Sequence, residues 1–142
     1  LDWREHGQDY AKMMMRVAKA LAQELARLGM PVFETRNGAT NSHQFALKAE
    51  SFGGGQMAAK KLRKANLLAS GIGLPVPAVA GDMNGLRLGT PEIVRWGVDE
   101  ERATRLAQLI AKALNSSDPA SLASEVSDFR SHFRNLRYII TN

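Results

Sequence analysis

Hydrophobic positions near the start of the chain recur at steps of three and four. The apolar stripe comprises Met14, Val17, Ala18, Leu21, Leu25 and Leu28. This spacing is typical of the buried face of an amphipathic helix. Gly29 and Pro31 then provide stop signals. The pattern predicts a long helix from Asp2 to Leu28.

The pattern then changes to short segments with strand character. Val32 to Thr35 is rich in strand formers, Asn37-Gly38 is a strong turn signal, and His43 to Ala49 alternates with Phe45 and Leu47 on one side. These features predict two strands joined by a loop.

A helix and a further strand are expected next. The glycines 53–55 open a helical stretch over 56–64, and the short apolar segment 66–69 has strand character. Glycines and prolines interrupt 70–83 too often for a helix or a central strand, so we expect a loop there.

The segment 85–90 alternates two leucines with Arg87. In a strand this places Arg87 on the face opposite to Leu86 and Leu88. A helix capped by Asp99 and a last amphipathic helix after Asp118-Pro119 complete the pattern. The last apolar stripe contains Leu122, Val126, Phe129, Phe133 and Leu136.

The order of these elements predicts an α+β fold. We expect a long N-terminal helix and a small antiparallel or mixed sheet of three to four strands, with helices packed on one face. A length of 142 residues with 44% hydrophobic side chains is the usual size of one domain, here 1–142.

Composition narrows the environment of the protein. The chain has no cysteine and no apolar run long enough to span a membrane, so we expect a cytoplasmic protein without membrane contact. The net charge is +5. The dense basic run 60–64 has no interleaved aromatic residue, so we interpret it as a solvated helix face and expect no nucleic-acid partner.

Four kinds of candidate site can be weighed from the residues. Arg87 could bind a carboxylate through two parallel hydrogen bonds, although a strand arginine is more often solvent-facing or paired with a local acid. The glycines 53–55 could cradle a phosphate, but they fit neither common glycine fingerprint, and a flexible connection is favoured. The histidines lack partners at metal spacing, so no metal site is expected. The adjacent Ser42 and His43 do not establish a nucleophile with its base.

The run Gly85-Leu86-Arg87-Leu88-Gly89-Thr90-Pro91 resembles the Gly-hydrophobic-Arg-hydrophobic-Gly-Thr-Pro motif of the serine hydroxymethyltransferase family. Other parts agree in order over about residues 9–114, and the motif around Arg87 is the most specific of them. These further matches are Lys19-Ala20-Leu21-Ala22, Thr40-Asn41-Ser42-His43, Lys64-Ala65-Asn66 and Arg95-Trp96-Gly97.

The resemblance implies the C-terminal small domain of a fold-type I pyridoxal-phosphate enzyme, in which Arg87 grips the carboxylate of a glycine- or serine-like amino-acid substrate. It also implies that the cofactor lysine lies in a large domain absent from this chain, so the chain alone is expected to be inactive. The complete enzyme is expected to be a homo-oligomer that binds pyridoxal phosphate mainly through that large domain.

Two departures from the family weaken the case for tetrahydrofolate as the one-carbon donor. Ser42 stands where the family has an asparagine implicated in folate binding, and the loop 73–83 differs from the family's usual stretch. Ser42 and His43 remain candidates for contacts on the cofactor or folate side. A related aldolase, transaldolase or α-methylserine-type enzyme is one alternative. A stand-alone binding module, regulating a full-length homologue or binding a carboxylated metabolite, is another.

Overall fold

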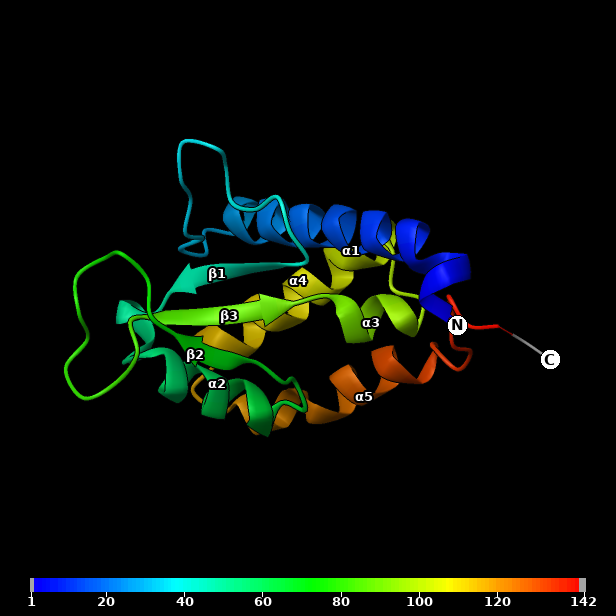
Figure 1. Cartoon of the computed structure of the whole chain (residues 1–142). Helices are drawn as coiled ribbons and strands as arrows, with labels where there is room; N and C mark the ends of the chain where they lie inside the picture. Colours follow the sequence, from blue (N-terminus) through cyan, green and yellow to red (C-terminus); the bar gives the residue numbers. More distant parts are fainter. Residues whose placement is uncertain (1, 141–142) are drawn as a thin grey trace.

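The computed structural model of the chain describes residues 2–140 and has the α+β order that the sequence predicts. A long helix opens the chain, and three short strands alternate with helices (Figure 1). The elements are α1 (Asp2–Arg27), β1 (Gln44–Lys48), the 3-10 helix η1 (Glu50–Phe52), α2 (Gly55–Lys64), β2 (Ser70–Ile72), β3 (Gly85–Gly89), α3 (Pro91–Arg95), α4 (Glu100–Asn115), the 3-10 helix η2 (Pro119–Leu122) and α5 (Ala123–Ser131).

The sheet is antiparallel, with β3 in the centre and the strand order β1-β3-β2. Leu47 pairs with Leu86, and Phe45 pairs with Leu88. Residues directly opposite one another share a face of the sheet. All four side chains are buried, so this face belongs to the core. In Figure 1, α4 passes behind the sheet, which confirms the prediction of helices packed on one face.

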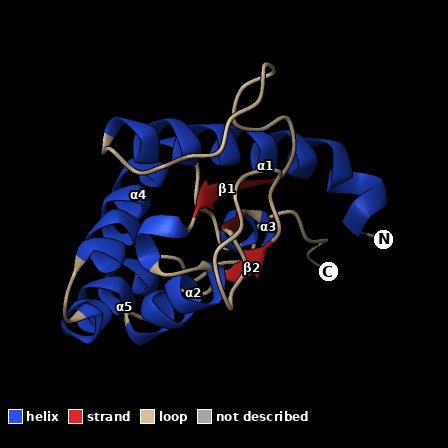
Figure 2. Cartoon of the chain, turned by 90° about the vertical axis from the view of Figure 1, so that its left-hand side faces the viewer, coloured by secondary structure: helices blue, strands red, loops and turns tan. Residues whose placement is uncertain are grey.

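The predicted stripe of α1 forms one wall of the core. Val17, Leu21 and Leu25 are at most 2% exposed, and α1 packs mainly against α4. The buried residues of α4 include Ala103 and Ala107, which are fully buried. Such small side chains let two helix backbones approach closely. The view along the molecule in Figure 2 shows α1 and α4 side by side.

The strand predicted at 32–35 is wrong. The amide of Phe33 donates to the Ala46 carbonyl, and that of Lys48 donates to the Pro31 carbonyl, but only the single pair Val32–Leu47 forms an isolated bridge. The chain then closes a tight turn between Thr35 and Gly38 through two reciprocal backbone hydrogen bonds. The turn begins too early for this edge segment to extend along β1.

The strand predicted at 66–69 lies instead at Ser70–Ile72, inside the expected loop. Gly71 does not break this strand. A Cβ atom on Gly71 would lie 3.1 Å from Cδ of Gln56, so the glycine allows α2 to pack against β2. The segment 73–84 that follows is a loop as predicted, and it projects from the same end of the molecule as the segment 33–42 (Figure 1).

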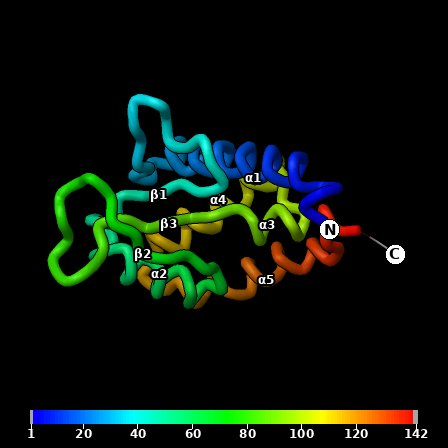
Figure 3. The backbone as a smooth tube through the Cα atoms, viewed as in Figure 1, coloured from blue at the N-terminus to red at the C-terminus, as the bar shows by residue number. Residues whose placement is uncertain are grey.

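Two features near the end of the chain differ from the predicted pattern. Residues 91–95 form a short helix, α3, which was not predicted. The last helix ends at Ser131 instead of continuing along the stripe to Leu136. The amide of Arg137 donates to the Arg95 carbonyl (2.7 Å), and this bond turns the tail back toward α3. Figure 3 shows the tail reaching the beginning of α1.

Candidate functional site

Arg87 lies in the middle of the central strand, on the face of the sheet that is turned away from the core. Its two cross-strand partners are Ala46 on β1 and Ser70 on β2. The side chain is exposed, whereas Leu86 and Leu88 on either side are buried. Two hydrogen-bonded ladders therefore hold the backbone of Arg87, and a rigid mount of this kind suits a residue that must fix a ligand's orientation.

The guanidinium of Arg87 has one hydrogen-bond partner within residues 2–140. Its Nε donates to Oγ of Ser70 across a distance of 3.2 Å. The ion pairs of the described residues are all formed by other basic side chains, and Arg87 belongs to none of them. The sequence leaves two structural alternatives for Arg87, a solvent-facing side chain or a side chain paired with a local acid. The structure shows an exposed side chain, and no acidic partner among the described residues.

Small residues surround Arg87 on its face of the sheet. Gly85 and Gly89 precede and follow it by two positions, and Ala46 lies directly opposite. The space above Gly85 is filled by Leu74, because a Cβ atom there would lie 2.6 Å from the leucine side chain. Beside Gly89 the nearest such atom is Cδ of Pro91 at 3.7 Å. The approach to Arg87 is therefore more open on the Gly89 side.

Ser42 and His43 lie just before β1, near the end of β3 that carries Gly89. The hydroxyl of Ser42 takes part in a local turn, where it lies 3.3 Å from the Gln44 amide and 3.4 Å from the Thr40 hydroxyl. The carbonyl of His43 accepts the Thr90 amide (2.9 Å). The hydrogen bonds of Ser42 with described residues are all local, and none of them reaches Arg87.

Thr90 fastens this end of the strand to the rest of the fold. Its side chain is fully buried, and its hydroxyl lies 2.8 Å from the Met14 carbonyl on α1 and 3.0 Å from the His43 carbonyl. From the sequence, Thr90 stands out only as part of the motif. A buried hydroxyl needs acceptors, and these come from segments distant in sequence, so pattern alone could not identify its role.

The amides that follow the glycine run 53–55 are already occupied. The carboxylate of Asp82 accepts from the amides of Gln56 (2.9 Å) and Met57 (3.0 Å), the first turn of α2. These backbone hydrogen bonds, that of Gln56 foremost, lower the pKa of Asp82. The glycines also serve packing, since a Cβ atom on Gly55 would lie 2.0 Å from the Gly85 carbonyl oxygen. The helix start is therefore capped by the protein's own acid, and two glycines of the run, Gly54 and Gly55, lie close against neighbouring residues.

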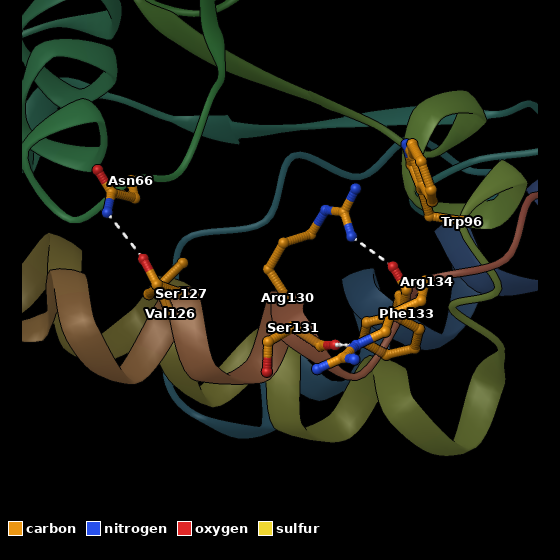
Figure 4. A pocket seen from close by; sticks show the side chains of 8 residues that line it. All are labelled: Asn66, Trp96, Val126, Ser127, Arg130, Ser131, Phe133 and Arg134. Atoms are coloured by element: carbon orange, nitrogen blue, oxygen red, sulfur yellow. Dashed lines mark hydrogen bonds between the residues drawn. The ribbon is translucent and has the colours of Figure 1, made fainter.

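A separate hollow of about 560 Å³ lies between α3, α5 and the segment after α2 (Figure 4). The guanidinium of Arg130 stacks over the Trp96 ring, 4.2 Å from its centroid. The Arg134 Nε donates to the Ser131 carbonyl at 3.1 Å. Arg87 does not line this hollow, so it is distinct from the exposed sheet face.

Two further observations concern ligands and membranes. No group of three or more His, Asp or Glu side chains within residues 2–140 is arranged to hold a metal ion. In the same part of the chain, none of the helices is both long and apolar enough to cross a bilayer.

Comparison with known proteins gives strong matches over almost the whole chain. It is 51% identical to an α-methylserine aldolase from Ralstonia sp over 98% of the chain, and 40% identical to a serine hydroxymethyltransferase from Korarchaeum cryptofilum over 93% of the chain. The L-threonine transaldolase structure from Pseudomonas fluorescens matches 96% of the chain with a TM-score of 0.83 and 27% identity. No family model matches the sequence.

These matches show that the chain is homologous to a segment of fold-type I pyridoxal-phosphate enzymes. Within that class it is homologous to serine hydroxymethyltransferases and α-methylserine aldolases, and the resemblance predicted from the Arg87 motif is confirmed. The chain spans about a third of the length of these relatives, 32% of each aldolase and 31% of the transaldolase chain.

The described residues do not form a pyridoxal-phosphate site by themselves. All described lysines are exposed except Lys61, which is half-buried and donates to the Leu114 carbonyl at 2.6 Å. The amides at the start of α2 are capped by Asp82. The residues of this segment thus offer neither an enclosed lysine nor a free phosphate cradle.

Proposed function

We propose that this chain is the small domain of a serine hydroxymethyltransferase-like enzyme and supplies Arg87 as the anchor for the carboxylate of an amino-acid substrate. The observation that carries the proposal is an exposed guanidinium without a carboxylate partner, mounted on the central strand within the family motif. An arginine of this kind binds a carboxylate with two charge-assisted hydrogen bonds.

The substrate would lie on the Arg87 face of the sheet, with the cofactor held mainly by the other two thirds of a complete enzyme. In this arrangement the chain binds and orients, because holding the carboxylate fixes where the substrate Cα lies. Pyridoxal phosphate therefore enters the proposal as a ligand of the complete enzyme, and the isolated chain is expected to be inactive.

Sequence identity favours an aldolase over a folate-dependent transferase. Four α-methylserine aldolases are 51–54% identical to the chain, whereas the serine hydroxymethyltransferases compared are 35–40% identical. Aldol cleavage of α-methylserine breaks its Cα–Cβ bond and gives alanine and formaldehyde. We therefore propose this reaction class for the complete enzyme, with tetrahydrofolate unnecessary.

The test is a full-length chimera in which this chain replaces the matching third of the Ralstonia aldolase. Formaldehyde release from α-methylserine is measured without tetrahydrofolate, and serine is compared with and without it. The proposal expects kcat/KM of Arg87→Ala to fall by about 100-fold, because removing one partner of a charge-assisted pair costs roughly 2–3 kcal/mol.

Arg36→Ala is a matched control, since Arg36 lies on the exposed turn at 33–42 and not on the sheet. Equal kcat/KM for the parent chimera and Arg87→Ala would refute the role of Arg87. Activity with serine that depends strictly on tetrahydrofolate, and none with α-methylserine, would favour the hydroxymethyltransferase instead.

A further inference from the structure

The only side-chain hydrogen bond that Arg87 makes within residues 2–140 is with the neighbouring strand. Ser70 lies directly opposite Arg87 in the β2–β3 ladder, and its Oγ is 3.2 Å from Nε of the arginine. Ser70 is half-buried, whereas Arg87 is exposed. The hydroxyl makes no other hydrogen bond with described residues. Among the described residues, Arg87 is thus the one hydrogen-bond partner of the Ser70 hydroxyl.

This contact determines which edge of the guanidinium is left for a ligand. A guanidinium carries five N–H donors in a planar fork, one on Nε and four on Nη1 and Nη2. A carboxylate can bind either the edge formed by Nε and one Nη atom or the edge formed by the two Nη atoms. Because Nε already donates to Ser70, the edge formed by Nη1 and Nη2 is the one with two free donors.

Other neighbours cannot take over this task. Ala46, on the opposite side of Arg87, has only a methyl group, and Gly85 and Gly89 have no side chain. Long cationic side chains have several rotatable bonds, and their ordering costs conformational entropy when a ligand binds. A hydrogen bond that already restrains the arginine removes part of that cost.

We propose that Ser70 is a positioning residue, which holds Arg87 by Nε so that the two Nη atoms face the substrate carboxylate. The inference rests on the proposed role of Arg87. Ser70 itself does not touch the substrate in this arrangement. It acts through the orientation of Arg87, and its effect falls on binding more than on the chemical step.

The experiment uses Ser70→Val and Ser70→Thr in the full-length chimera. Valine and threonine have nearly the same shape, and both suit a strand, but only threonine keeps the hydroxyl. For α-methylserine, we expect Ser70→Val to raise KM roughly tenfold with kcat within about twofold, and Ser70→Thr to stay close to the parent. Ser70→Ala serves as a second hydroxyl-free variant if Ser70→Val does not fold.

A double substitution separates this inference from the proposed function. In an Arg87→Ala background, Ser70→Val should have no further effect on KM, because the residue on which Ser70 acts is missing. Two results would overturn the role of Ser70 and leave that of Arg87 intact, both with an activity loss in Arg87→Ala. In the first, the KM of Ser70→Val equals that of the parent. In the second, Ser70→Thr raises KM as much as Ser70→Val does. An unaffected Arg87→Ala would instead overturn the proposed function.

A second measurement does not depend on activity. Proton exchange at Nε of Arg87 is followed by NMR in the 142-residue chain, with Arg36 as an exposed reference. Protection is expected with serine or threonine at position 70 and should be lost in Ser70→Val. Equal exchange at Arg87 with and without the hydroxyl would contradict the proposed hydrogen bond.

Discussion

Thr90 is the one polar residue within residues 2–140 whose side chain is buried. We expect Thr90→Val to lower the free energy of unfolding by about 1 kcal/mol. Valine has nearly the same shape as threonine, but it has no hydroxyl that could donate to the Met14 or His43 carbonyl. Chemical denaturation measures the change. Thr90→Ser keeps the hydroxyl and should retain the denaturation midpoint better; the reverse order would contradict this role.

Asp82, which binds the start of α2, makes a pH-dependent contribution to the stability of the fold. Backbone amides of Gln56 and Met57 donate to its carboxylate and lower its pKa. A carboxyl group whose pKa is lower in the folded state stabilises the fold above its unfolded pKa, near 3.9, and this contribution is lost as pH falls through the folded pKa.

We therefore expect the folded chain to be more stable than Asp82→Asn at pH 7, with the difference shrinking below about pH 4. Thermal unfolding of both proteins between pH 7 and pH 2 measures this difference. A gap of constant size over the whole range would show that the charge of Asp82 is not its cause.

The sequence predicts the position of some side chains, but it does not predict their hydrogen-bond partners. The alternation of 85–90 was enough to place Arg87 away from the leucines, and the structure has it there. The partnership with Ser70 could not be foreseen, because it depends on the register between strands separated by the loop 73–84. The same holds for Asp82, whose hydrogen bonds reach 25 and 26 residues back along the chain.

At the scale of elements, the packing of α1 against α4 is the contact to test. Leu25 on α1 is fully buried in the core, whereas Met15 on the same helix is 37% exposed. We expect Leu25→Ala to lower the free energy of unfolding by about 2–5 kcal/mol, since it leaves a cavity in the core. Met15→Ala should change it by no more than about 0.5 kcal/mol. Similar losses for both variants in urea denaturation would contradict the packing described.

Besides Asp82, a second side chain of the loop 73–84, that of Asn84, holds the loop at its end. The Asn84 Oδ1 accepts the Leu74 amide (2.7 Å), and its Nδ2 donates to the carbonyls of Leu74 and Val76 (both 2.9 Å). We expect Asn84→Ala to speed hydrogen exchange and proteolysis within the loop, while amides of α1 keep their protection. Uniform loss of protection in both regions would mean that Asn84 supports the whole fold instead.

The elements with strong periodicity were predicted well, and short elements were not. The helices at 2–27, 55–64 and 100–115 have clear apolar stripes or capping signals, and they formed with ends close to those expected. The strand Ser70–Ile72 was missed because glycine was interpreted only as a breaker, whereas Gly71 serves close packing. A three-residue strand exists only through its pairing with β3, which the local sequence does not encode.

At the scale of the whole molecule, the two ends of the described chain meet. The rings of Tyr10 on α1 and Tyr138 in the tail stack with centroids 5.1 Å apart, and the Asp2 carboxylate accepts the Ile140 amide at 3.1 Å. We expect Tyr138→Ala to cost about 1 kcal/mol of stability and to increase hydrogen exchange at the start of α1. Leu136→Ala, which removes an exposed side chain, is the control. Unchanged exchange in Tyr138→Ala would refute this link.

The position of β3 in the sheet also sets the order in which the protein can form during synthesis. Its neighbours β1 and β2 both precede it in sequence and do not pair with each other. Until residue 89 has left the ribosome, neither earlier strand has its partner, and α4, which covers α1, follows later still. Between the synthesis of residue 48 and that of residue 89 the nascent chain therefore carries β1 without its partner strand, a period in which chaperones can protect it from aggregation.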